Sequence, residues 1–323
     1  MTRSVSAPTA DQAVQYRGVR ARFRAPRRRG DRPRTPRWQR REQIVALAAV
    51  LPAVIVVFAF MLYPIGYAVW LSFNKSDGFV STFTGLSNYT DILTSSLVHQ
   101  VFLVNLKFLV SVPLVIFVAS VCAVLLYEEY FGWRFFRVVF FIPSVLSTAV
   151  IGLMFKSTFA YHGPVNSILE AAGVAPIDFF ARATPAMFVI ILALVWSGFG
   201  YQMLILLSGL SAIDPEIFSA ARVDGAGWWQ RFWYITMPNI RRQLAFVCII
   251  NVLYTFTSLF GFIFVMTAGG PGYTTTTLDY LIYQEAFSNA DIGRGAALAI
   301  LVFLLIGVMT VVQLKMFRAS EEN

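Results

Sequence analysis

Long apolar windows, each of about 20 residues, restrict the fold of this chain more than any other feature of its sequence. They lie near residues 44–73, 101–126, 136–156, 185–209, 243–267 and 296–315. A helix rises ~1.5 Å per residue, so each window is long enough to cross ~30 Å of hydrocarbon. Hydrophobic residues make up 57% of the chain and charged residues only 13%, which exceeds what the core of a soluble protein needs. We therefore expect an all-α, polytopic membrane protein with about six transmembrane helices.

Residues 1–43 differ from the rest of the chain in composition. Arginine dominates them, proline recurs at positions 26, 33 and 36, and apolar periodicity is lacking. We expect a disordered cytoplasmic tail that contacts membrane lipids, followed by a transmembrane domain at 44–317 and a cytoplasmic C-terminus at 318–323. The basic stretch is too long for a signal peptide. Its charge leaves nucleic-acid binding open as an alternative, but no nucleic acid is expected as a partner.

The distribution of Lys and Arg sets the expected orientation of the spans. Basic residues gather in the tail, around 134–137, around 222–242 and after the last span, whereas the loops on the other side carry few. Loops rich in Lys and Arg stay in the cytoplasm. Both termini and the loop at 211–240 are therefore expected to be cytoplasmic, and the loop at 268–295 is expected on the outer side.

The loop at 211–240 has a local pattern of its own. Asp214 before Pro215 is typical of a helix start, since Asp accepts from the free N–H groups and Pro lacks one. Ala220 and Ala221 permit close approach of another backbone, and Gly225 favours a turn. Residues 228–234 are rich in aromatic side chains that suit the headgroup level, and a proline at 238 is expected to end this segment. An interfacial hairpin without a partner would explain the same features.

This loop resembles the EAA loop of importer-type ABC transporter permeases. Ser219-Ala220-Ala221, then Gly225, then Ile235-Thr236-Met237-Pro238 keep the spacing of the family pattern Glu-Ala-Ala, Gly and Ile-x-Leu-Pro. Ser219 stands where Glu is usual, which removes a carboxylate, and Met237 replaces Leu. The resemblance implies contact with an ATPase through Glu216, Ser219, Ala220, Ala221, Asp224, Gly225 and Pro238.

A second motif lies in the outer loop. Gly269-Gly270-Pro271, a run of threonines and Tyr283-Gln284-Glu285-Ala286-Phe287 are similar to the loop after the penultimate helix of maltose-type sugar permeases. From the residues alone, this is a Gly/Pro turn followed by a Thr-rich polar edge. The two motifs occur in the family's order and on opposite sides of the membrane.

Together the motifs imply the type I ABC importer permease fold. Such a chain pairs with a second permease subunit as a heterodimer, works with two ATPase subunits and an extracytoplasmic solute-binding protein, and lies in the inner membrane of a prokaryote. The sequence has no Gly-Lys pair and hence no GxxxxGK[ST] phosphate-binding loop. We expect no cofactor in this chain, with ATP and Mg bound by the partner ATPase, and a transport subunit rather than an enzyme.

The spans contain almost no charged side chains, which favours a neutral polyhydroxyl solute such as a sugar over an ion. Hydroxyl, amide and aromatic groups near the middle of the spans are the candidates to hold it. In span three, Pro143 is expected to kink the helix, with Ser144 and Thr148 one turn apart on one face. The candidate solute-binding residues are Ser144, Thr148, Trp196, Ser197, Gly198, Tyr201, Asn251, Tyr254, Thr255 and Ser258. Ordinary helix packing by small and polar residues would explain each of them equally well.

Several alternatives stay open. Leu259 stands where the maltose member of the family has a polar amide, so maltose itself is not implied. Glycerol phosphate would require a buried basic side chain, which the spans lack. A polytopic membrane enzyme or a channel is a further alternative, but Glu128-Glu129 is interpreted as solvating a short loop, and no metal site is expected from two separated histidines and two cysteines in apolar runs.

Overall fold

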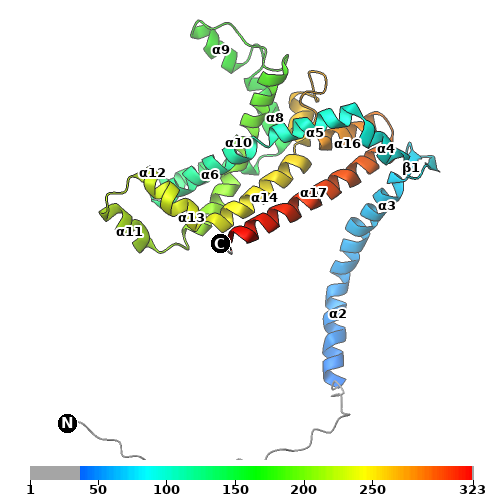
Figure 1. Cartoon of the computed structure of the whole chain (residues 1–323), viewed down its shortest axis with the longest axis horizontal. Coiled ribbons are helices and arrows are strands. Elements are labelled where there is room, and N and C mark those ends of the chain that lie inside the picture. Colours follow the sequence, from blue (N-terminus) through cyan, green and yellow to red (C-terminus); the bar gives the residue numbers. More distant parts are fainter. Residues whose placement is uncertain (1–36, 322–323) are drawn as a thin grey trace, which may run out of the picture. The chain divides into compact units, whose positions relative to one another are not determined.

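In a computed structural model, residues 37–321 are described and the chain divides into two units, Met1–Leu62 and Tyr63–Asn323 (Figure 1). The described part of the first unit is one continuous helix, α2 (Arg37–Val57), which passes into the π-helix η1 (Phe58–Leu62). The π-helix ends two residues before Pro64, whose missing N–H and bulky ring disturb the regular helical bonding before it. The last residues of the expected tail are therefore helical, and residues 1–36 lie outside the described residues.

The second unit is helical apart from one short hairpin. Strands β1 (Asn74–Ser76) and β2 (Ser81–Phe83) pair antiparallel, with Asn74 opposite Phe83. The first helices are α3 (Tyr63–Ser72), α4 (Ser87–Thr94), α5 (Ser96–Phe108), α6 (Ser111–Tyr127), α7 (Trp133–Phe141), the 3-10 helix η2 (Ile142–Val145), α8 (Thr148–Thr158) and α9 (Pro164–Ala171). They are followed by α10 (Ala183–Leu210), α11 (Pro215–Val223), α12 (Trp228–Arg231), the π-helix η3 (Phe232–Thr236), α13 (Met237–Asn239), α14 (Arg241–Thr257), α15 (Phe260–Met266), α16 (Leu278–Tyr283), the π-helix η4 (Gln284–Ser288) and α17 (Ile292–Glu321).

The expected spans correspond to these helices. Val45–Ser72, Ser96–Tyr127, Ala183–Leu210 and Ile292–Phe317 are each long and apolar enough to cross a membrane. The third and fifth spans are bent pairs instead, α7–η2 with α8 and α14 with α15, and counting each pair as one span gives 6 within the described residues. The prediction of a polytopic all-α membrane protein is confirmed.

Span three breaks completely rather than kinking. Its two parts, Trp133–Val145 and Thr148–Thr158, meet at 98°. Pro143 opens the short 3-10 helix η2, and the hydroxyl of Ser147 then accepts from the amide of Val150 and starts α8 afresh. The expectation that Ser144 and Thr148 lie one turn apart on one helix is therefore wrong, because they belong to different helices.

The break in span five is held by side chains from other elements. The amide of Asn105 on α5 donates to the carbonyl of Thr255 at 2.8 Å and accepts from the backbone N–H of Leu278 at 2.7 Å, while the residue is fully buried. Asp279 on α16 accepts from the backbone N–H of Phe260, the first residue of α15, at 2.6 Å. Backbone groups that the break frees inside the protein thus find partners, as membrane proteins require.

The threonine run after the Gly-Gly-Pro turn is buried rather than a polar edge. Thr275, Thr276 and Thr277 are fully buried. The hydroxyl of Thr275 donates to the carbonyl of Gly270 at 2.8 Å, and that of Thr276 to the carbonyl of Gly269 at 3.1 Å. These hydrogen bonds hold the loop folded back on itself, because each hydroxyl takes the place of water as the donor to a buried backbone carbonyl.

The ends of the second unit are distinct. Figure 1 shows α11, α12 and α13 at the end where α17 finishes, and α4 and β1 at the other end, where α17 begins. The long helices α6 and α10 pack along each other between these ends. The loop at 211–240 and the last residues of α17 therefore lie at one end of this unit.

Candidate functional site

A cavity of about 280 Å³ lies among α6, η2, α8, α10 and α14. Of the ten candidate solute-binding residues, its lining includes Ser144, Thr148, Ser197, Gly198, Tyr201, Asn251, Tyr254 and Thr255. These residues come from three separate spans, and the breaks in spans three and five bring them together. Leu259, which lies within the break in span five, also lines the cavity and adds an apolar wall. None of the described residues that line this cavity carries a charge.

Trp196 and Ser258 are not among the residues that line the cavity. The Trp196 ring packs in the apolar core against Phe155, with ring centroids 5.8 Å apart. Ser258 follows the last residue of α14, and its hydroxyl lies 3.2 Å from that of Thr257. The three- and four-residue spacing that placed Ser258 on the cavity face holds only while the helix continues, and it ends one residue earlier.

The hydroxyl of Ser144 is inserted into the hydrogen-bond ladder of α10. It donates to the carbonyl of Ser197 at 2.8 Å and accepts from the amide of Tyr201 at 3.1 Å, two groups that would bond each other in an undisturbed helix. Gly200 permits this, because a Cβ there would collide with the carbonyl of Phe140. Ser144 thus fixes η2 against α10 and shapes the cavity wall.

An amide pair links α10 to α14 at the cavity. The side-chain N–H of Gln202 donates to the side-chain oxygen of Asn251 at 2.6 Å. The hydroxyl of Thr255 donates to the backbone carbonyl of Asn251 at 2.9 Å. Gln202 was not among the candidates from the sequence, although a primary amide in the apolar run of span four is a signal that could have identified it, since such groups are costly in a membrane unless they are paired or functional.

The loop at 211–240 forms the expected helix and turn. Asp214 caps α11 by accepting from the amide of Glu216 at 2.9 Å. Gly225 has φ +78°, a left-handed conformation that glycine adopts without strain. No atom of the described chain lies within 4 Å of the position that a Cβ at 225 would take. The glycine is needed here for backbone conformation and not for space within this chain.

The two alanines of the loop differ in exposure. Ala220 is exposed, whereas Ala221 is buried beside Phe218, which packs on Tyr127 with ring centroids 5.4 Å apart. The expectation that both alanines form one docking face is therefore wrong for Ala221. The other predicted coupling residues, Glu216, Ser219, Asp224, Gly225 and Pro238, are exposed. Pro238 lies inside α13, and the helical segment ends one residue after it, at Asn239.

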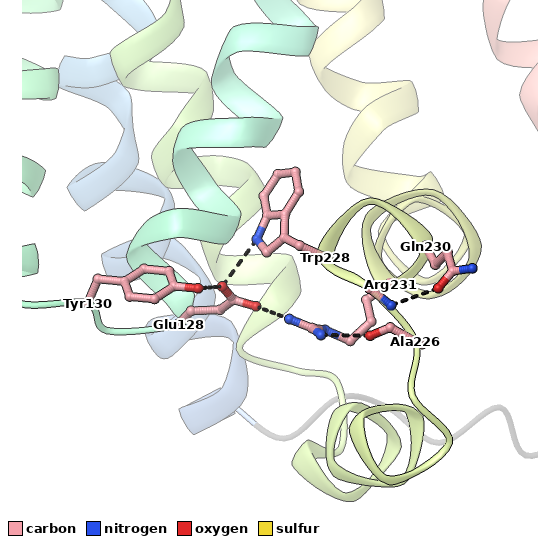
Figure 2. Close-up of polar contacts among 7 residues, drawn as sticks. Glu128, Tyr130, Ala226, Trp228, Gln230 and Arg231 are labelled. Carbon is pink, nitrogen blue, oxygen red and sulfur yellow. Dashed lines mark hydrogen bonds and ion pairs between the residues drawn. The ribbon is translucent and has the colours of Figure 1, made fainter.

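Glu128 connects the end of α6 to the loop. One carboxylate oxygen pairs with Arg231 at 3.0 Å, and the other accepts from the indole N–H of Trp228 at 3.2 Å and the hydroxyl of Tyr130 at 2.6 Å (Figure 2). Arg231 also donates to the backbone carbonyl of Ala226 at 2.9 Å, so it braces the turn between α11 and α12. The interpretation of Glu128 as a group that solvates a loop is wrong, since its side chain is 12% exposed and fully bonded.

A larger cavity of about 460 Å³ lies between α6, η3, α14 and α17. Its walls are mostly apolar, with Arg241 and Arg242 among its lining residues, and it contains none of the predicted coupling or solute-binding residues. Among the described residues there is no group of three or more His, Cys, Asp or Glu side chains that could hold a metal ion.

Comparisons with known proteins agree on one family. The family described as binding-protein-dependent transport system inner membrane component matches residues 116–318. The chain is 31% identical to the trehalose/maltose transport system permease protein MalF of Thermococcus litoralis, over 88% of this chain and 97% of that protein. It is also 31% identical to the sn-glycerol-3-phosphate transport system permease protein UgpA of Escherichia coli, over 82% of this chain and 91% of that protein.

A solved structure shows the same fold. In the crystal structure of a bacterial alginate ABC transporter in complex with an alginate pentasaccharide-bound periplasmic protein, one chain superposes with a TM-score of 0.76 at 19% sequence identity. The match covers 87% of this chain and 97% of that chain.

Proposed function

Because the chain belongs to the family of binding-protein-dependent transport system inner membrane components, and is thus a permease subunit of an ABC importer, we propose that it imports a neutral sugar or related polyhydroxyl solute. The proposal places the solute in the cavity among η2, α8, α10 and α14. It is a transport subunit and not an enzyme, and its ATP is hydrolysed by a separate subunit.

One observation carries the choice of solute: the cavity offers hydroxyl, amide and aromatic groups and no charged side chain among the described residues that line it. Tyr201 and Tyr254 supply the ring surfaces on which the C–H face of a sugar stacks. Ser197 and Thr255 supply hydroxyl oxygens that accept hydrogen bonds from solute hydroxyls, and Asn251 holds the amide of Gln202 at the cavity. Relatives of equal identity include a trehalose/maltose and a glycerol-3-phosphate permease. A phosphate would require a basic partner, so the cavity favours the first class.

The proposed coupling runs from the exposed face of α11 to this cavity. We place Glu216, Ser219, Ala220, Asp224 and Gly225 against an ATPase subunit, which moves α11 as a rigid body when it closes on ATP. Arg231 and Glu128 pass that motion to the end of α6. Since α6 packs along α10, which carries Ser197 and Gln202, the cavity would open alternately to the two sides.

The partners follow from the same proposal. A second permease subunit completes the pore as a heterodimer, two ATPase subunits bind ATP and Mg, and an extracytoplasmic solute-binding protein delivers the solute. The assembly would lie in the inner membrane of a prokaryote, where the exposed apolar surfaces of the spans contact lipid.

The test is uptake by the complete importer, co-expressed with its partner subunits and reconstituted into proteoliposomes. Radiolabelled trehalose, maltose and sn-glycerol-3-phosphate are compared. Uptake of a sugar, reduced by Ser197→Leu and Thr255→Leu with assembly intact, supports the proposal, because each leucine fills a cavity of only about 280 Å³. Uptake of the phosphate alone would contradict it.

A further inference from the structure

The side-chain carbonyl of Gln202 is buried at the cavity without a partner. Gln202 is 6% exposed and lines the cavity, and its Oε1 accepts no hydrogen bond from any described residue. Buried polar atoms nearly always find a partner, because losing water without replacement is costly. This oxygen is therefore free to accept a hydrogen bond from a donor outside the chain.

The neighbouring hydrogen bonds show that the free group is an acceptor. Asn251 donates through its Nδ2 to the backbone carbonyl of Val247 at 2.8 Å, one turn earlier in α14. Its Oδ1 must then face Gln202, which can meet it only with its own N–H group, at 2.6 Å. Turning the Gln202 amide over would set two oxygens against each other. The order of bonds from Val247 through Asn251 to Gln202 thus leaves Oε1 at the cavity.

Other hydroxyl groups at the cavity already donate their hydrogens to backbone carbonyls of the protein. Ser144 donates to Ser197, Thr255 donates to Asn251, and Ser197 donates to the carbonyl of Leu194 at 3.2 Å. The oxygens of these groups keep lone pairs, so together with Gln202 they make this wall rich in acceptors. A hydroxyl group can satisfy such a wall, whereas a carboxylate or phosphate oxygen brings further lone pairs and is repelled.

We propose that Gln202 Oε1 accepts a hydrogen bond from one hydroxyl of the transported solute and so selects neutral hydroxylated solutes over anionic ones. This inference rests on the proposed function, since it assigns a partner to the cavity where the solute is placed. Gln202 is then a solute-binding residue held in position by Asn251, with the amide fixed before the solute arrives.

The experiment pairs a protein change with a solute change. Gln202→Met keeps the length of the side chain and removes the amide, and trehalose is compared with its monodeoxy analogues in the reconstituted importer. In the unaltered importer, one analogue should be taken up at least about tenfold more slowly than trehalose, because its missing hydroxyl leaves Oε1 buried and unpaired. In Gln202→Met that ratio should approach one.

Controls separate this role from a purely structural one. ATPase stimulation by the loaded solute-binding protein reports assembly of each variant, so loss of the discrimination with this stimulation intact separates a contact with the solute from a structural role. If Gln202→Met does not assemble, Gln202→Asn, which withdraws the carbonyl by one methylene, carries the same expectation.

Two results would overturn the proposal, and they are distinguishable. If trehalose is transported and the ratio of its uptake rate to that of each monodeoxy analogue is the same in Gln202→Met as in the unaltered importer, the role of Gln202 is contradicted. The proposed function would still stand. Uptake of sn-glycerol-3-phosphate without any sugar uptake would contradict both.

Discussion

Glu128 and Arg231 stand 103 positions apart in the chain and meet through a 3.0 Å ion pair that ties the end of α6 to the loop after α11 (Figure 2). Their side chains are only 12% and 15% exposed, so the pair is shielded from the screening that weakens surface ion pairs. Trp228 and Tyr130 complete the bonding of the carboxylate. The contact thus joins the coupling loop to the end of a helix that lines the cavity.

We predict that Arg231→Met uncouples ATP hydrolysis from uptake. Removing the guanidinium leaves a mostly buried carboxylate short of a donor, at a cost of roughly 1–3 kcal/mol, and frees the turn at Ala226. The number of ATP molecules hydrolysed per solute imported should rise in proteoliposomes. Glu128→Gln, which keeps an acceptor for Trp228, should have a smaller effect. Arg137→Met, which removes an exposed charge from α7, is the control, and an unchanged ratio for Arg231→Met would refute the coupling path.

Gly225 provides a second prediction because its requirement is conformational. Its φ of +78° costs a residue with a Cβ about 1–2 kcal/mol, yet no described atom lies near the Cβ position. Gly225→Asn should therefore keep most uptake, since Asn tolerates this conformation, whereas Gly225→Trp should abolish uptake by blocking the ATPase contact. Both should insert normally in the membrane. Wild-type uptake by Gly225→Trp would show that nothing docks there.

The sequence predicts what is local and misses what depends on tertiary contacts. Lengths and apolarity of the spans are local, so the spans were located within a few residues. The complete break after Pro143 depends on Ser147 capping α8 and on Ser144 bonding across to α10, which no window of sequence contains. Ser144 and Thr148 line the same cavity, but the argument that places them on one helix is incorrect.

The same limit applies to the site. The sequence around Gln202 does not indicate that it bonds to Asn251, because Asn251 lies on another span. Trp196 satisfies every sequence criterion for a sugar-binding aromatic residue, yet packing against Phe155 turns it into the core. The sequence around Glu128 does not indicate that its side chain pairs with Arg231. Helical spacing places residues on a face, but it does not say which face meets the cavity.

A third prediction concerns the break in span five. Asn105→Ala removes two buried hydrogen bonds, to Thr255 and from Leu278, and should destabilise the protein by roughly 2–4 kcal/mol. Because Thr255 lines the cavity, uptake should fall as well. Asn88→Ala is a matched control, since Asn88 also donates to two backbone carbonyls but lies away from the cavity. Thermal unfolding in detergent should show both losses, and uptake only the first.

Asp279 gives a prediction with pH. Burial raises the pKa of its carboxyl above the ordinary value of 3.8, although the hydroxyl of Thr277 and the amide of Phe260 donate to it and oppose the rise. The folded state therefore holds this proton more tightly than the unfolded state. The resulting stabilisation is complete below about pH 4 and is lost as pH rises through the folded pKa.

The thermal midpoint of the protein should accordingly fall less steeply as pH rises above about 4 in Asp279→Asn, which has no proton to lose there. Asp77 is the opposite control. It is exposed, and the amides of Val80 and Phe79 lower its pKa, so Asp77→Asn should change the slope little and in the other direction. If the thermal midpoint falls equally steeply with pH in Asp279→Asn and in the unaltered protein, the raised pKa of Asp279 is contradicted.

Gly261 sets the position of Thr148 at the cavity. A Cβ at 261 would collide with the hydroxyl of Thr148 and lie 2.9 Å from its Cβ, so α15 can pack on the start of α8 only without a side chain there. Gly261→Ala should cost about 1–3 kcal/mol through overpacking and lower uptake, because Thr148 must move. Adding Thr148→Ala relieves the worst contact and should restore part of the stability. Gly307→Ala on α17, where a Cβ meets nothing within 4 Å, should leave uptake unchanged and stability equal or higher. If the double variant were no more stable than Gly261→Ala alone, the contact with Thr148 would not be what the glycine protects.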